Sequence, residues 1–136
     1  MRVLALDVGT KTIGVAVSDE LQLSSNGLKT INRQSLKKDL DEIREIVDEY
    51  KPVEIVVGLP YREDGSLGKR GKDIEDLGKK IVNKFKLPVV YFDESYSTVF
   101  AEKALIEGDV SRKKRKKIID KMAAVVILQG YLDTKS

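Results

Sequence analysis

Apolar residues follow two different spacings along this chain, and the first of them predicts strands. Residues 2–9 and 12–19 form two nearly continuous apolar runs around a glycine-bearing turn, which is typical of a buried hairpin. Residues 21–31 are a plausible third strand, with a turn or bulge at Asn26 and Gly27. The amino-terminal part of the chain therefore predicts antiparallel strands.

Helical spacing begins after these strands and alternates with two further apolar runs. Ser35 can cap the first helix and Pro52 stops it. The predicted helices span residues 35–50, about 72–85, 97 or 98 to 108, and 111 to about 132. The predicted strands between them span residues 53–60 and 89–92.

The order of these elements predicts the fold class. Strand–helix–strand units favour parallel pairing with right-handed crossovers, whereas the opening hairpins supply antiparallel strands. We therefore expect one α/β domain over residues 1–136, with a mixed five-stranded sheet flanked by helices on both faces.

Composition narrows the chemistry that such a domain can perform. Among the 136 residues there is no histidine and no cysteine, which excludes the commonest general base, thiolate metal sites and a cysteine nucleophile. A metal would need oxygen ligands, which favours Mg²⁺ or Mn²⁺. No apolar run approaches the length of a membrane span, so we expect a cytoplasmic protein without a membrane partner.

Acidic residues and glycines follow the predicted parallel strands. Asp7 ends the first run, residues 58–60 read Gly-Leu-Pro, and Asp93 and Glu94 follow the last strand. In open α/β sheets, sites form beyond the carboxyl ends of the parallel strands. These residues are candidate ligands there, although Gly and Asp are also common turn residues at strand ends.

Asp120 is a further candidate because of its position on the last predicted helix. It begins a stripe that continues with Ala124, Ile127 and Tyr131. A carboxylate on an inner helix face needs a partner. Two alternatives remain open from the pattern: a salt bridge to a neighbouring lysine, or a metal shared with Asp7. Two metal ions in such an acid cluster can hold a phosphodiester and activate water.

Basic residues gather in two segments near these acids. The run "RKKRKK" leads directly into Asp120, and the loop "YREDGSLGKRG" carries three glycines. A solvated helix face and a solvated loop are the plain alternatives to phosphate binding. The candidate nucleic-acid contacts are Lys11, Arg62, Lys69, Arg70, Arg112, Lys113 and Lys116.

Four motifs resemble, in order and spacing, those of the RuvX (YqgF) family of RuvC-like nucleases. They are "DVGTKTIGVAVSD", "GLPYREDGSLGKRG", "DESYST" and "DKMAAVVILQGYLD", and together they span nearly the whole chain. The resemblance implies a ribonuclease-H-like fold and a divalent-metal phosphodiesterase site. It implies that Asp7, Glu94 and Asp120 are both the catalytic residues and the metal ligands, with Asp93 as the alternative to Glu94.

The sequence departs from the family pattern at two positions. Thr12 stands where the family commonly has a second basic residue after Lys11, and Ser95 replaces the arginine of the family's "DER". Both arginines could contact phosphate. The departures therefore concern substrate affinity and leave the acid cluster intact.

We expect a metal-dependent nuclease that processes the 5′ end of the pre-16S ribosomal RNA, as the resemblance implies. The alternatives are a Holliday junction resolvase, a nucleic-acid-binding module without turnover, and a sugar-kinase-like ATPase, because "DVGT" before a hairpin also occurs at the phosphate site of such folds. The expected partner is structured RNA or branched DNA, and the expected state is a monomer or weak homodimer. A resolvase needs two sites and hence a dimer.

Overall fold

The protein is described here from a computed structural model, which covers residues 1–62, 64–93 and 112–135. Side chains of α4 are described from residue 122 onward. The elements are β1 (Val3–Val8), β2 (Thr12–Ser18), β3 (Ser25–Asn32), α1 (Leu36–Tyr50), β4 (Glu54–Leu59), α2 (Lys69–Phe85), β5 (Val89–Asp93) and α4 (Arg112–Lys135).

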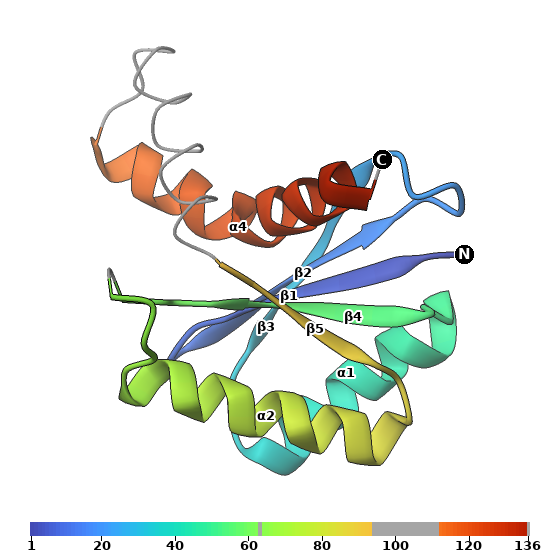
Figure 1. Cartoon of the computed structure of the whole chain (residues 1–136), viewed down its shortest axis with the longest axis horizontal. Coiled ribbons are helices and arrows are strands. Elements are labelled where there is room, and N and C mark those ends of the chain that lie inside the picture. Colours follow the sequence, from blue (N-terminus) through green and yellow to red (C-terminus); the bar gives the residue numbers. More distant parts are fainter. Residues whose placement is uncertain (63, 94–111, 136) are drawn as a thin grey trace.

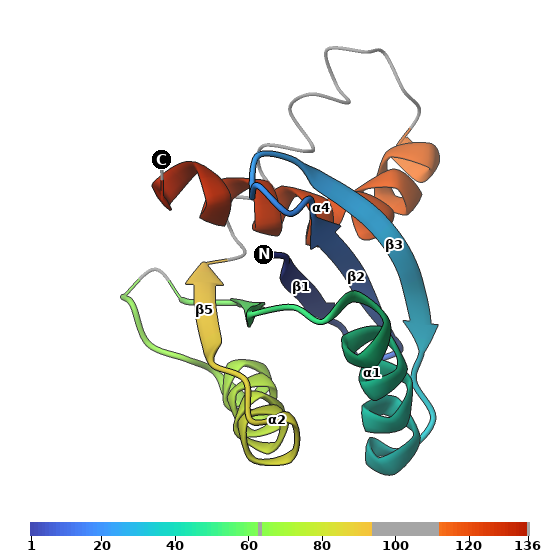
Figure 2. The same cartoon turned by 90° about the vertical axis from the view of Figure 1, so that its right-hand side faces the viewer.

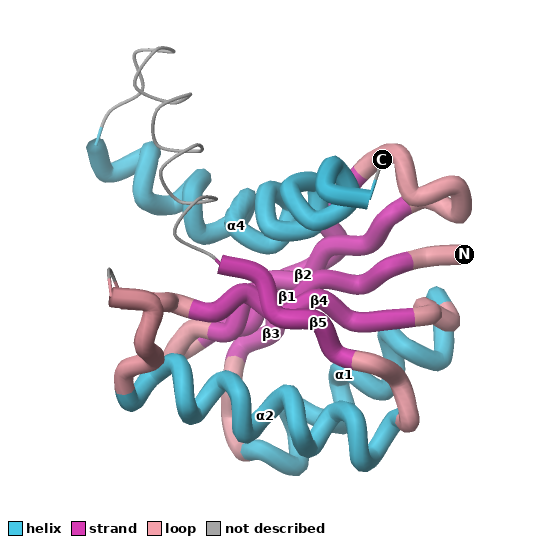
Figure 3. Tube along the Cα trace, viewed as in Figure 1, coloured by secondary structure: helices cyan, strands magenta, loops and turns pink. Residues whose placement is uncertain are grey.

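The strands form one five-stranded sheet in the order β3-β2-β1-β4-β5 (Figure 1). β1 pairs antiparallel with β2, and β2 pairs antiparallel with β3. β4 pairs parallel with β1, and β5 pairs parallel with β4. Figure 3 shows helices on both faces of this sheet. The mixed five-stranded sheet predicted from the sequence is therefore confirmed.

The boundaries differ from the predicted ones in the β2–β3 connection. β3 begins at Ser25, because residues 19–24 form a connecting turn. The carboxylate of Asp19 accepts hydrogen bonds from the backbone N–H groups of Leu23 (2.7 Å) and Ser24 (3.0 Å). These bonds lower the pKa of Asp19 below its ordinary value. The β2–β3 ladder shifts register where Val15 pairs with Lys29 and Ala16 pairs with Gly27, so the expected irregularity is a bulge.

The helices largely follow the predicted ranges. α1 begins after Ser35, whose hydroxyl accepts a hydrogen bond from the N–H of Lys38, and it ends before Lys51, which has a left-handed backbone conformation. α2 begins at Lys69, three residues before the predicted start. The predicted helix at 97–108 lies outside the described residues. No helix in the described ranges is long and apolar enough to cross a membrane.

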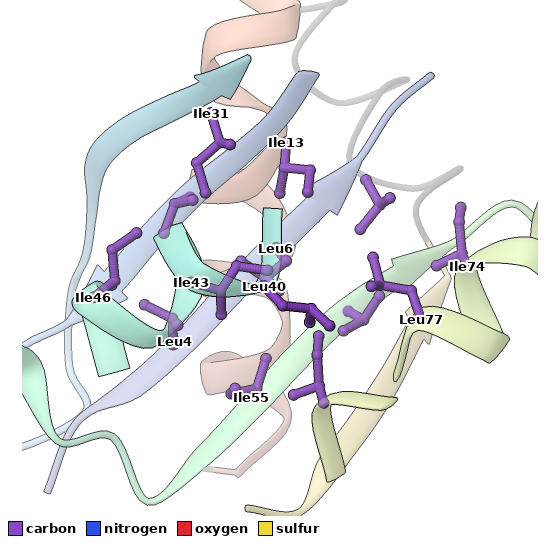
Figure 4. Close-up of a cluster of buried hydrophobic side chains, with 14 of the residues drawn as sticks. Leu4, Leu6, Ile13, Ile31, Leu40, Ile43, Ile46, Ile55, Ile74 and Leu77 are labelled. Atoms are coloured by element: carbon purple, nitrogen blue, oxygen red, sulfur yellow. The ribbon is translucent and has the colours of Figure 1, made fainter. Parts of the chain in front are cut away.

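One face of the sheet packs against α1 and α2, which lie side by side along it (Figure 2). Figure 4 shows the aliphatic side chains that fill this layer, which we call the α1/α2 core. It includes Leu4, Leu6 and Ile55 from the strands and Ile43 and Leu77 from the two helices. Each of these residues is buried, so burial of large aliphatic groups holds both helices on this face.

Among the described elements, α4 packs against the opposite face, in a layer that we call the α4 core. Its buried members are Val3, Ala5, Ala16, Val56, Ala124, Ile127, Leu128 and Leu132. Small residues bring the helix close to the strands. A Cβ built on Gly130 would lie 3.0 Å from the Phe92 ring, and one built on Gly27 would lie 3.4 Å from Val125. The Ser25 hydroxyl donates to the Val125 carbonyl (2.9 Å), so β3 also contacts the helix backbone.

Candidate active site

The carboxyl ends of β1, β4 and β5 lie at one edge of the sheet, beside the first turns of α4 (on the left in Figure 1). Asp7 is the last but one residue of β1. Val3 and Ala5 belong to the α4 core, whereas Leu4, Leu6 and Val8 belong to the α1/α2 core. Because side chains alternate along a strand, Asp7 faces α4. It is half-buried there.

Two glycines flank Asp7 on this face. Gly14 on β2 is its cross-strand partner. On the other side, the register that pairs Leu6 with Val57 brings Gly58 of β4 next to Asp7. The two residues next to Asp7 on the neighbouring strands are therefore glycines, which have no side chain, and the Asp7 carboxylate faces the helix between them. In the sequence, both glycines are visible as interruptions of two otherwise apolar strands.

Asp93 lies on the opposite face. It is the last residue of β5 and pairs with Leu59, a member of the α1/α2 core. Val89 and Tyr91, which share its alternation, also pack against that core. The structure thus places the sheet between Asp93 and the Asp7 side chain, a separation that the sequence pattern left open.

For the other two predicted ligands, the structure describes only the backbone position of Asp120. Glu94 lies outside the described residues. Asp120 lies on α4, one helical turn before the buried Ala124, and its side chain is outside the described part. Among the described residues, no three acidic side chains gather closely enough to hold a metal ion. The clustering of Asp7, Glu94 and Asp120 therefore stays a prediction.

The donor chemistry at Asp7 fits the predicted metals. Asp7 offers carboxylate oxygens, which Mg²⁺ and Mn²⁺ prefer. The two residues predicted to join it are also acids, and the chain contains no softer histidine or cysteine ligand. The flanking Gly14 and Gly58 place no competing side chain beside that carboxylate on the sheet.

The basic loop after β4 folds back as a short hairpin. Tyr61 bridges to Leu67, and the N–H of Arg62 donates to the Ser66 carbonyl (2.8 Å). The Asp64 carboxylate accepts from the hydroxyl (2.6 Å) and the N–H (2.9 Å) of Ser66. These bonds lower the pKa of Asp64 below its ordinary value, so it stays ionised and holds the turn. Leu67 packs against the α1/α2 core and anchors the hairpin.

The predicted contacts Arg62, Lys69 and Arg70 lie together at the start of α2. A Cβ built on Gly68, the N-cap of α2, would lie 3.0 Å from the Arg62 guanidinium, so the missing side chain lets Arg62 approach the helix. No acid occupies the first turn of α2. Lys69 and Arg70 thus add positive charge beside a helix N-terminus, where the helix dipole does not favour cations. Arg70 also donates to the Val8 carbonyl (3.3 Å).

Lys11, Arg112, Lys113 and Lys116 complete the predicted basic set. Lys11 is exposed in the β1–β2 turn. The other three occupy the first turns of α4, at the same edge of the sheet as the ends of β1 and β4 (Figure 1). Their side chains are outside the described part.

Arg33, which contacts the turn after Asp7, and its acidic partner Asp39 do not stand out in the sequence pattern. Arg33 follows β3 and donates from its guanidinium to the Gly9 carbonyl (2.9 Å). Asp39 in the first turn of α1 forms an ion pair with Arg33 (3.1 Å) and is buried, with 2% of its surface exposed. Neither belongs to a recognisable motif. A single acid among the apolar positions of an amphipathic helix was the available signal.

Comparison with known proteins decides the family. Residues 1–134 match the family described as "RuvX: Holliday junction resolvase". The chain belongs to the RuvX family. A relative from Geobacillus kaustophilus, named "Putative pre-16S rRNA nuclease", is 55% identical over 137 residues, covering 99% of this chain and 99% of the relative. A relative of the same name from Desulforamulus reducens is 50% identical, covering 98% of each chain.

Solved structures show the fold. The RuvC structure from Thermus thermophilus superposes with a TM-score of 0.58 at 13% identity, covering 99% of this chain and 96% of that one. The fowlpox virus Holliday junction resolvase superposes with a TM-score of 0.56 at 11% identity, covering all of both chains. The RuvX chain therefore has the ribonuclease-H-like fold that its motifs implied.

Proposed function

We propose that this RuvX chain is a divalent-metal-dependent nuclease that hydrolyses phosphodiester bonds at the 5′ end of the pre-16S ribosomal RNA. The relatives that share about half of its residues over nearly the whole chain carry the name of that activity. The observation that carries the proposal in the structure is the position of Asp7, on the α4 face between Gly14 and Gly58.

Asp7, Glu94 and Asp120 would hold the metal in this proposal. Glu94 is favoured over Asp93 because Asp93 faces the α1/α2 core, on the other side of the sheet from Asp7. Asp120 is supported by its place one turn before Ala124, which is buried against the sheet. Mg²⁺ or Mn²⁺, when bound, would polarise the phosphate and activate water for attack on phosphorus.

The basic residues would bind and orient the substrate. The hairpin and the start of α2 present Arg62, Lys69 and Arg70 below the edge that carries Asp7, and the cationic turns of α4 lie above it (Figure 1). Lys11 lies in the β1–β2 turn, four residues after Asp7. Such an arrangement neutralises backbone phosphates on both sides of the scissile bond, so binding should weaken steeply with salt. Few aromatic residues are available for base stacking, which favours recognition of shape and backbone.

The deciding experiment compares cleavage of a pre-16S RNA leader with that of a four-way DNA junction, each in Mg²⁺ and in Mn²⁺. We expect cleavage of the RNA, with a loss of at least about a hundredfold in Asp7→Asn, the range for losing a group that stabilises transition-state charge. Asp41→Asn is the matched control, because Asp41 is a surface acid on α1 whose Lys84 partner is 3.9 Å away. Thermal unfolding of both variants should stay close to wild type.

The other outcomes separate the alternatives. Cleavage of the DNA junction alone would favour the resolvase activity in the family description. Binding that persists in EDTA, without cleavage in either metal, would favour a binding module. Full activity in Asp7→Asn would overturn the site assignment.

A further inference from the structure

The turn that follows Asp7 is held by one arginine at two points. The backbone N–H of Arg33 donates to the Lys11 carbonyl (2.9 Å), and its guanidinium Nη1 donates to the Gly9 carbonyl (2.9 Å). The turn itself is closed by the Gly9 N–H, which donates to the Thr12 carbonyl (2.8 Å). Arg33 therefore contacts both Gly9 and Lys11, the first and last residues of the β1–β2 turn.

Asp39 fixes the other side of the same guanidinium. Its Oδ2 accepts from Arg33 Nε (3.1 Å), and its Oδ1 accepts from the Gln34 N–H (3.1 Å). Asp39 is 2% exposed and lies in the first turn of α1, which is anchored in the α1/α2 core. A guanidinium is a rigid planar fork, so holding Nε fixes the direction in which Nη1 points.

A second arginine reaches the adjacent carbonyl from the other helix. Arg70 of α2 donates to the Val8 carbonyl (3.3 Å). A cavity of about 100 Å³ lies beside the turn, lined by both arginines and by Gly9. Arg33, in the connection between β3 and α1, and Arg70 of α2 thus both donate to the backbone that follows Asp7.

The Gly9–Thr12 hydrogen bond and the paired strands on either side close the turn, and the two arginines add contacts to its backbone carbonyls. Gly9, Thr10 and Lys11 bury no large side chain, and Thr10 and Lys11 are exposed. Segments with few buried apolar contacts open locally at low free-energy cost. Small displacements of a catalytic group reduce rates strongly, so a loose turn would misplace both Asp7 and Lys11.

We infer that Arg33, oriented by the buried Asp39, is a positioning residue that holds the β1–β2 turn so that Asp7 and Lys11 are aimed at the substrate on the α4 face. The inference rests on the proposed nuclease function. The support of the turn by Arg33 does not depend on that function: Arg33, held by Asp39, contacts the turn from the α1/α2 side of the sheet, and Asp7 faces the other side.

The first test is chemical rescue of Arg33→Ala. We expect kcat to fall about 10- to 100-fold with little change in KM, because phosphate contacts remain. Free guanidinium at a few millimolar, far below denaturing concentrations, should restore part of kcat by filling the space beside Gly9 and Asp39. Arg44→Ala is the matched control: Arg44 lies on α1 and stacks on Phe85 (5.2 Å), away from the turn. It should keep its kcat and show no rescue.

Asp39→Asn separates positioning from simple stabilisation. Its kcat should also fall, but guanidinium should not restore it, because the arginine is still present. Equal loss of kcat in Arg33→Ala and Arg44→Ala, or a loss that only follows the unfolded fraction, would overturn the inference.

A readout without catalysis distinguishes this inference from the proposed function. Backbone amide exchange, measured by NMR, should accelerate at Gly9 in Arg33→Ala and stay unchanged in Arg44→Ala. If the wild-type protein cleaves no nucleic acid, the proposed function fails, and the exchange rates still decide whether Arg33 holds the turn. Unchanged exchange at Gly9 in Arg33→Ala would show that it does not.

Discussion

The two faces of the sheet are built differently. The α1/α2 face of the sheet carries large aliphatic side chains such as Leu4, Leu6 and Ile55, and α1 and α2 cover it. The α4 face carries smaller side chains, valines and alanines, together with glycines, and among the described elements α4 covers it. The first arrangement maximises buried apolar area. The second brings a helix close to the strands at the cost of buried volume, and this is the face that carries Asp7.

This difference separates stability from chemistry within one domain. The α1/α2 core stabilises the sheet and, through Arg33 and Arg70, supports the turn after Asp7. The α4 core sets the distance between that acid and the helix that carries Asp120. The far end of α4 is held by polar contacts: Glu54 accepts hydrogen bonds from the Tyr131 hydroxyl (2.9 Å) and from Lys135 Nζ (2.8 Å).

The largest effect on stability is expected in the α1/α2 core. Ile43→Ala removes a fully buried side chain and should lower the free energy of unfolding by about 2–5 kcal/mol. Urea unfolding measures the loss. Activity per folded molecule should stay near wild type, because Ile43 lies in the α1/α2 core, on the other side of the sheet from the Asp7 side chain. A loss of kcat well beyond the unfolded fraction would contradict the division between the faces.

The second prediction compares Asp7 with Asp93, two acids at the same edge on opposite faces. Asp7→Asn should lower cleavage at least about a hundredfold, whereas Asp93→Asn should keep most of it. Initial rates at saturating Mg²⁺ measure both. Similar losses in the two variants would show that the sheet does not separate their roles.

The third prediction concerns helix approach. Ala124→Leu adds volume where α4 meets the sheet and should cost about 1–3 kcal/mol in unfolding free energy. Its cleavage rate should fall more than that of Ile43→Ala, although its stability falls less, because the helix that carries Asp120 is displaced. If activity simply follows stability in both variants, the α4 face has no special role.

The smallest effect is expected at Asp19, an acid with a capping role far from the site. Backbone N–H groups of Ser24 and Leu23 lower its folded-state pKa, so its contribution to stability is present above its ordinary pKa and is lost as the pH falls through the lower folded value. Asp19→Asn should be slightly less stable than wild type at pH 7, and the difference should vanish in acid. Thermal unfolding from pH 7 to pH 2 measures this, with cleavage at pH 7 unchanged.

The sequence by itself determined most of the described strands and helices and their order, because the apolar spacing that predicts each element is a local property. β1, β2, α1 and β4 follow that spacing closely, and the motifs around Asp7 predicted the family. The hairpin register pairs Gly14 with Asp7 locally, whereas Gly58 comes to the other side of Asp7 through the parallel pairing of β1 with the distant β4.

Only the tertiary structure decided which acid faces which side. The family resemblance favoured Glu94 over Asp93 as the ligand, and the pairing of Asp93 with Leu59 assigns Asp93 to the α1/α2 face. The support of the turn by Arg33 and Asp39 was likewise invisible, because it joins the end of β3, the start of α1 and the backbone after β1. Such contacts depend on where separate elements meet in space, and the spacing of residues along one element does not predict them.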